Sequence, residues 1–135
     1  MQFWDGGVVC MFLKANVAKN IECDIQACSI FWIYRSARFR HYILYFKDEP
    51  VSVLTLQVDG PLASFWNGAT LPNFRRKGFS TILRAHALNE AKKEECKYII
   101  SYLMEKAMAK GVCEKLGLKT AWVFYPYIKE FKSVS

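Results

Sequence analysis

Hydrophobic residues recur along the chain with two periods, one typical of strands and one typical of helices. A short apolar run from Val8 to Leu13 predicts a first strand. Asn16 then offers a helix cap, and the spacing that follows predicts a helix from Asn16 to about Arg35. Its apolar residues lie three or four positions apart, at Val17, Ile21, Ile25, Cys28 and Trp32.

The middle of the chain predicts an antiparallel meander of three strands. Aromatic and β-branched residues predict strands from Phe39 to Phe46, from Val51 to Val58 and from Leu62 to Leu71. Turn-forming residues at 47–50 and at 59–61 separate these strands.

The chain after residue 78 predicts two amphipathic helices, and a strand follows each of them. Apolar spacing predicts a helix from Phe79 to about Glu95, with Arg84 expected away from its apolar face. A strand from Lys97 to Leu103, a helix from Met104 to Lys115 and a last strand at 121–125 follow. The residues of the first helix expected to face the core are Phe79, Ile82, Leu83, Ala87 and Ala91.

This order of strand, helix, meander, helix, strand, helix and strand predicts an α/β fold with a mixed, mostly antiparallel sheet flanked by helices. A length of 135 residues fits one domain, spanning residues 1–135. Because 53% of the residues are hydrophobic and 16% are aromatic, a disordered chain is excluded.

Charge points to an anionic ligand. The chain carries 19 Lys and Arg against 12 Asp and Glu, for a net charge of +7. The basic residues are scattered except at 35–40 and 75–77, and only the second cluster lies in a recognisable motif. Composition alone leaves nucleic acid, a membrane surface and a phosphorylated cofactor open.

Cysteine usage predicts neither a metal site nor a disulfide framework, because the five cysteines form no C-x-x-C pair and the two histidines lie far apart. Asp5 stands where a signal peptide would carry a cation, and no apolar run reaches the roughly 18 residues of a membrane span. We therefore expect a cytoplasmic protein with reduced thiols, no metal and no membrane partner.

The segment from Leu71 to Thr81 carries the clearest chemistry. An apolar strand runs into a basic turn that contains Gly78 and then directly into a helix. Backbone N–H groups at a helix start lack partners within the helix, and the helix dipole adds positive charge there. The pattern predicts a phosphate cradle; a surface turn that merely needs a left-handed glycine is the alternative.

The hexapeptide from Arg75 to Ser80 resembles the acyl-CoA signature of the GCN5-related N-acetyltransferases, Gln/Arg-x-x-Gly-x-Gly/Ala, with Ser80 as the last small residue. The segment Val112–Leu118 resembles the family's later (Leu/Val)-Tyr-Glu-Lys-Leu-Gly-Phe element. Together with the strand order, the resemblance covers about two-thirds of the chain, from Phe39 to Tyr127. It implies an acyl-CoA N-acyltransferase fold.

This resemblance also implies a reaction and a set of contacts. An amine would attack the thioester of acetyl-CoA directly in a ternary complex, and a backbone N–H near Leu71 would stabilise the oxyanion. Ala69 and Leu71 would pair with the pantetheine through backbone groups. The pyrophosphate would be bound by backbone N–H groups across Arg75, Arg76, Lys77, Gly78, Phe79, Ser80 and Thr81.

Two candidate catalytic residues carry open alternatives. Cys113 stands where many family members place the tyrosine that protonates the departing CoA, so it is either a substitute acid or a small packing residue. Asn67 interrupts an apolar strand and either faces the acceptor cleft or marks a bulge. Further candidates, each explained more simply by packing or solvation, are Tyr102, Tyr125, Tyr127, Glu105, Glu114 and His86.

The front of the chain departs from the family, which usually places two helices there, whereas only one is predicted here. The shortened acceptor half is completed by a second subunit in a homodimer, or by a missing N-terminal region, or it leaves an open groove. The departures also motivate an alternative function, a catalytically silent acetyl-CoA sensor or interaction domain. Nucleic-acid binding through the aromatic and basic residues at 74–79 is a third, less favoured reading.

Overall fold

The computed structural model describes residues 8–14, 28–35, 38–125, 127, 129, 131 and 132. Within this part of the chain, one sheet contains seven strands in the order β2-β3-β4-β5-β6-β1-β7. Two α-helices and a short 3-10 turn complete the described elements. Their bounds are β1 Val8–Lys14, β2 Cys28–Arg35, β3 Phe39–Phe46, β4 Glu49–Asp59, β5 Leu62–Thr70, η2 Pro72–Phe74, α1 Phe79–Lys93, β6 Tyr98–Met104, α2 Met108–Lys115 and β7 Lys119–Phe124.

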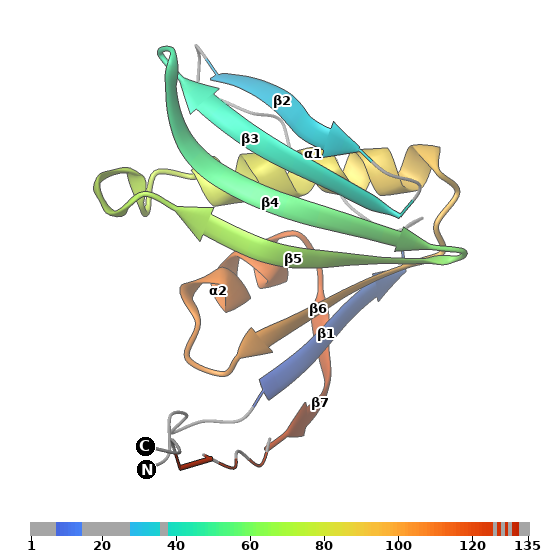
Figure 1. Cartoon of the computed structure of the whole chain (residues 1–135). Coiled ribbons are helices and arrows are strands. Elements are labelled where there is room, and N and C mark those ends of the chain that lie inside the picture. Colours follow the sequence, from blue (N-terminus) through green and yellow to red (C-terminus); the bar gives the residue numbers. More distant parts are fainter. Residues whose placement is uncertain are drawn as a thin grey trace.

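The sheet consists of two antiparallel groups that meet at one parallel pair. Strands β2 to β5 form a meander, and β6, β1 and β7 form the second group. Between the groups, β5 and β6 are parallel and pair only over Leu62–Phe65 and Tyr98–Ser101. Beyond these residues the two strands diverge, and α2 lies beside the opening between them (Figure 1).

The helix predicted from Asn16 to Arg35 is wrong in its C-terminal part, because residues 28–35 form β2 and pair antiparallel with β3. The residues from Ile30 to Tyr34 are all β-branched or aromatic, which favours an extended strand, and the helical spacing of Cys28 and Trp32 was incidental. The meander therefore has four strands. The part of the predicted helix at residues 16–27 lies outside the described residues.

The remaining elements are confirmed with shifts at their ends. The predicted helix at Met104 begins later, because Met104 still pairs with β1 as the last residue of β6 and α2 starts at Met108. The mixed, mostly antiparallel sheet with flanking helices is confirmed.

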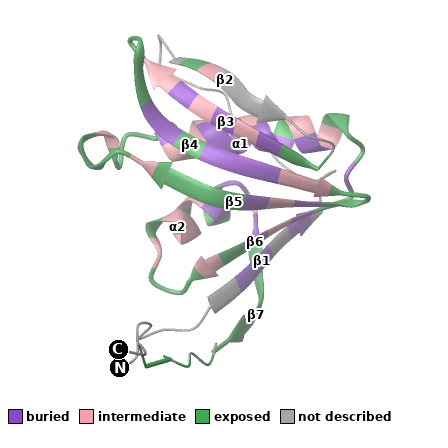
Figure 2. Ribbon diagram, in the orientation of Figure 1, coloured by how far each residue is buried: buried purple, intermediate pink, exposed green. Residues whose placement is uncertain are grey.

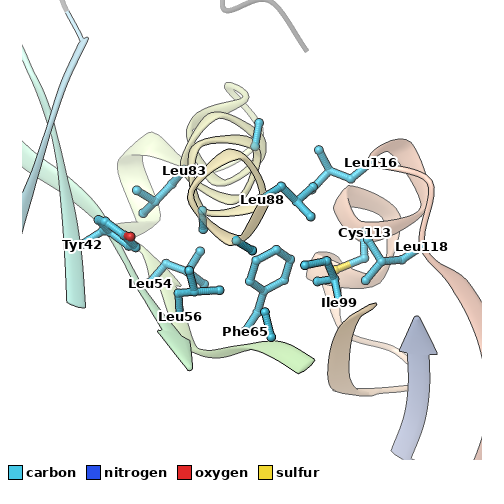
Figure 3. Packing of buried hydrophobic residues seen from close by; sticks show 14 of the residues in the cluster. Tyr42, Leu54, Leu56, Phe65, Leu83, Leu88, Ile99, Cys113, Leu116 and Leu118 are labelled. Carbon is cyan, nitrogen blue, oxygen red and sulfur yellow. The ribbon is translucent and has the colours of Figure 1, made fainter. Parts of the chain in front are cut away.

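The core lies between the sheet and the two helices. Helix α1 packs on β3, β4 and β5, and α2 packs on α1 and β6. Buried positions follow the inner face of β3 and β4 beneath α1 (Figure 2). Side chains from both strand groups and both helices meet in one cluster (Figure 3), which includes Leu54, Leu56, Phe65, Leu83, Leu88, Ile99, Cys113, Leu116 and Leu118.

One buried cation inside this layered structure has an anionic partner. Arg40 on β3 is 5% exposed, and its Nη2 donates to Glu94 Oε1 at 2.6 Å, just past the end of α1. The pair joins the meander to the helix that covers it. Arg40 Nη1 has no hydrogen-bond partner among the described residues, so Glu94 is the main compensation for the buried charge.

We expect Glu94→Gln to lower the free energy of unfolding by about 1–2 kcal/mol, because a buried guanidinium would lose its counter-charge. Urea denaturation measures this change. The matched control is Glu90→Gln, which removes a carboxylate paired with the exposed Lys93 and should cost less than about 0.5 kcal/mol. Equal losses in the two variants would contradict a special role for the Arg40 pair.

Candidate functional site

A cavity of about 590 Å³ opens beside the parting of β5 and β6. It lies between the end of β5, the basic turn that follows η2, the first turns of α1 and the start of α2. Residues 68–70 line it from β5, residues 74–76 and 78 from the turn, and residues 79–81 and 84 from α1. Its remaining lining comes from residues 107–109, 111, 112 and 115.

The turn before α1 has the backbone of an anion cradle. Gly78 caps the helix with φ 88, a left-handed conformation that a side chain disfavours, and no side chain caps the helix. Arg76 is also left-handed, with φ 60. The first N–H groups of α1 lack partners within the helix, and Phe79, Ser80 and Thr81 line the cavity there. The predicted cradle and the cavity therefore coincide.

The three consecutive cations of the turn differ in position. Arg75 and Arg76 line the cavity, and Arg75 Nε donates to the carbonyl oxygen of Thr70 at 3.0 Å, which ties the turn to the end of β5. Lys77 does not line the cavity, and its Nζ lies 5.6 Å from the centroid of the Phe74 ring. All three are exposed, so positive charge surrounds the mouth of the cavity.

The free backbone edge of β5 belongs to different residues from those expected. The N–H of Leu71 donates to Val51 on β4 and its carbonyl accepts from Phe74, and Leu71 does not line the cavity. Because alternate residues of a strand face the same neighbour, Ala69 also directs its backbone toward β4. The edge that faces the opening is that of Gly68 and Thr70, and on this edge the Thr70 carbonyl accepts from Arg75 Nε. Leu71 therefore offers no free N–H for an oxyanion.

A β-bulge lies at the point where β5 leaves β6. Thr55 pairs with Trp66 and Val53 with Ala69, so Asn67 and Gly68 together stand opposite Leu54. Asn67 has φ 53, which Asn tolerates better than most residues, and it is exposed outside the cavity. The bulge reading of Asn67 is confirmed, and its catalytic role stays a prediction.

Beneath this bulge lies Arg84, which was expected away from the apolar face of α1 but is only 5% exposed. Its Nη1 donates to Ser80 Oγ, and its Cζ lies 5.9 Å from the centroid of the Phe65 ring. A Cβ on Gly68 would lie 2.5 Å from Arg84 Nη2, so the missing side chain makes room for the guanidinium. Burial lowers the pKa of Arg84, and the neighbouring Cys113 opposes that shift.

Cys113 lies in the core rather than in the cavity lining. It is 0% exposed, packs with Ile99, Leu116 and Leu118 (Figure 3), and is a free thiol. Burial raises its pKa, opposed by the Arg84 guanidinium and the Ser101 hydroxyl. This position favours the packing role, and a role as proton donor stays a prediction.

The other candidates named from the sequence do not line the cavity. Tyr102 and the acidic Glu105 and Glu114 are exposed. His86 is half-buried against the Tyr42 ring at 5.2 Å, and burial lowers its pKa, so it is neutral at pH 7. Tyr125 and Tyr127 are exposed near the chain end.

Among the described residues, no group of His, Cys, Asp and Glu is arranged to hold a metal ion. A helix of the length and hydropathy needed to cross a membrane is also absent from the described part of the chain.

The family model described as "Acetyltransferase (GNAT) family" matches residues 12–118. No curated protein sequence matches the chain.

Solved structures share the fold at low identity. A GCN5-related N-acetyltransferase from Sphaerobacter thermophilus superposes with TM-score 0.73 at 8% identity, over 88% of this chain and 50% of that chain. One from Kribbella flavida superposes with TM-score 0.70 at 9% identity, over 88% and 56%. The ribosomal-protein-S18-alanine N-acetyltransferase from Escherichia coli gives TM-score 0.56 at 23% identity, over 62% and 54%. The chain thus spans about half the length of these proteins, and the likeness concerns the fold.

Replacing either of two glycines at the cavity by alanine should change the free energy of unfolding, in opposite directions for the two positions. Gly68→Ala should lower the free energy of unfolding by about 1 kcal/mol, because the added methyl group pushes the end of the Arg84 side chain out of its buried position toward the cavity. Gly111→Ala should raise it by about 0.5–1 kcal/mol, because Gly111 lies inside α2 with open space around its Cα. Urea denaturation checks both signs. A neutral or stabilising effect of Gly68→Ala would contradict the close contact with Arg84.

Proposed function

The chain belongs to the acetyltransferase (GNAT) family, and on this premise we propose that it is an N-acetyltransferase that moves an acetyl group from acetyl-CoA to a primary amine. The transfer is direct, in a complex that holds both substrates. The proposal rests mainly on one observation: the left-handed Gly78 opens α1 at the mouth of the cavity beside the diverging strands β5 and β6.

The residues at the cavity fit an acyl-CoA ligand. The backbone N–H groups from Gly78 to Thr81 suit a pyrophosphate, because no side chain caps the helix and its dipole favours negative charge. The exposed cations Arg75 and Arg76 suit the same phosphates. Farther in, the edge of β5 at Gly68 and Thr70 suits the amides of a pantetheine arm, which pairs there as an added strand would.

When bound, acetyl-CoA supplies an activated thioester carbonyl. The chain's own contribution is to hold that thioester at the parting of β5 and β6, where the amine reaches it from the open side. Attack by the amine nitrogen forms the carbon–nitrogen bond, the carbon–sulfur bond breaks, and its electron pair stays on the sulfur of CoA. The proton lost by the nitrogen passes to water; the described residues of the cavity lining include no carboxylate or imidazole.

We expect the chain to bind acetyl-CoA and expect Gly78→Asp to weaken this binding at least tenfold. An Asp side chain at φ 88 strains the turn and places a negative charge where phosphate oxygens bind. Isothermal titration calorimetry measures the dissociation constants.

The matched control is Gly60→Asp, which makes the same substitution at a left-handed glycine, φ 56, in the β4–β5 turn outside the cavity lining. It should bind acetyl-CoA as the wild type does. The cradle assignment is refuted if the wild type gives no heat at high micromolar concentration, or if Gly78→Asp binds undiminished.

Turnover separates an enzyme from a silent acetyl-CoA-binding domain. With acetyl-CoA and a panel of small amines, aminoglycosides and peptides with free N-termini or lysines, at least one amine should raise the release of free thiol well above the rate without amine. A thiol-reactive dye follows the release, with the signal of the protein's own cysteines subtracted. If no amine raises the rate while acetyl-CoA binds, the silent reading replaces catalysis.

A further inference from the structure

Arg84 is the most buried of the cations that line the cavity. It is 5% exposed, whereas Arg75, Arg76 and Lys115 are exposed at the outer part of the same lining. The outer cations and the helix N-terminus are placed to serve phosphates. The charge of Arg84 therefore needs a separate explanation.

No carboxylate contacts Arg84 within the described part of the chain. Its partners there are the Ser80 hydroxyl, the Phe65 ring and the Cys113 thiol, and its Nε is buried with no hydrogen-bond partner. Burying a guanidinium without an anion is costly, as the pairing of the equally buried Arg40 with Glu94 illustrates. An anion from outside the chain would remove this cost.

Cys113 does not supply that anion in the resting protein. Burial raises the pKa of its thiol above the ordinary value, so the thiol is protonated and neutral at pH 7. Ser101 on β6 lies beside that thiol, and Gly68 and Phe65 on β5 lie against the guanidinium; none of these three residues carries a charge.

The position of Arg84 identifies the end of the ligand it faces. Phe65 and Ser101 are the last paired residues before β5 and β6 diverge, and the guanidinium lies over Phe65 and against Gly68 of the bulge. A ligand whose phosphates occupy the turn and whose arm follows the β5 edge inward brings its far end to this point. For an acyl-CoA, that end is the thioester.

We propose that Arg84 is an anion subsite for the thiolate of CoA, formed when the carbon–sulfur bond of the thioester breaks. The inference rests on the proposed function. The amine nitrogen supplies the electron pair of the new bond, the carbon–sulfur pair moves to sulfur, and the amine proton goes to water. The guanidinium stays protonated throughout and stabilises the sulfur anion by a charge-assisted N–H···S hydrogen bond.

The test uses binding alone, so it needs no acceptor. Calorimetry compares CoA with desulfo-CoA, which carries the same phosphates and lacks the sulfur, from pH 6.5 to 9.5. The alkyl thiol of CoA is mostly protonated at neutral pH, and a neighbouring guanidinium lowers its pKa in the complex. The affinity of the wild type for CoA, relative to desulfo-CoA, should therefore rise about tenfold with pH and level off above the pKa of free CoA.

Arg84→Met keeps the apolar stem and removes the charge, so CoA and desulfo-CoA should give the same pH profile. Arg84→Lys should retain part of the rise. Lys93→Met removes one charge from the same helix outside the cavity lining and should behave as the wild type. Cys113→Ser should also keep the rise, which separates the ligand's thiol from the protein's.

Three results would overturn the subsite. The first is an equal pH profile of affinity for CoA and desulfo-CoA in the wild type, and the second is a rise of the CoA affinity with pH that survives in Arg84→Met. The third is a CoA affinity that does not change with pH, together with an Arg84-dependent preference for succinyl-CoA over acetyl-CoA. The last would assign Arg84 to a carboxylate on the acyl chain. If the wild type binds neither CoA nor desulfo-CoA, the proposed function itself fails. This outcome differs from a failure of the subsite alone, because then no variant gives heat with either ligand.

Discussion

The divergence of β5 and β6 after the Phe65–Ser101 pair is the constraint on which the rest of the structure depends. Parallel strands need a crossover connection, and here α1 supplies it, so the N-terminus of that helix lies at the end of β5 where the strands separate. The bulge at Asn67 and Gly68 turns β5 away from its neighbour. A backbone edge, a helix N-terminus and a cavity thus arise at one place from one topological requirement.

Some of the buried polar groups lie where β5 and β6 diverge. Over most of the sheet the inner face is apolar, as Leu54, Leu56 and Ile99 illustrate. At the opening, however, Arg84 and Ser101 are buried, and the Ser101 hydroxyl and Arg84 Nε lack hydrogen-bond partners among the described residues. Arg40, buried elsewhere between the sheet and α1, has its carboxylate. Arg40 Nη1 also lacks a hydrogen-bond partner among the described residues, so what distinguishes the opening is a buried cation with no described carboxylate beside it.

Much of this fold and part of the site were predictable from the sequence. Strands β3 to β6 and both helices follow from local periodicity, and the cradle follows from a glycine placed between a strand and a helix. The helix prediction for residues 28–35 was wrong because this run of β-branched and aromatic residues has a helical spacing by chance. The pairing with β3 shows that the segment is a strand. The sequence did not predict that the backbone of Gly68 and Thr70 faces the opening. A bulge shifts by one residue which positions of a strand face each neighbour, and the alternation of apolar and polar residues does not reveal this shift.

Arg84 shows most clearly what the sequence alone does not predict. Its position on α1, four residues after Ser80, places it one turn inside the cradle, but polarity alone predicted a solvated side chain. Only the absence of a side chain at Gly68, a residue 16 positions earlier, leaves room for the guanidinium beneath the bulge. Cys113, small and neutral, borders the same space where the family motif carries a tyrosine. A fixed cation beside a small thiol can stabilise a leaving thiolate without donating a proton, so losing the tyrosine changes how the negative charge is accommodated and does not by itself remove the means of accommodating it.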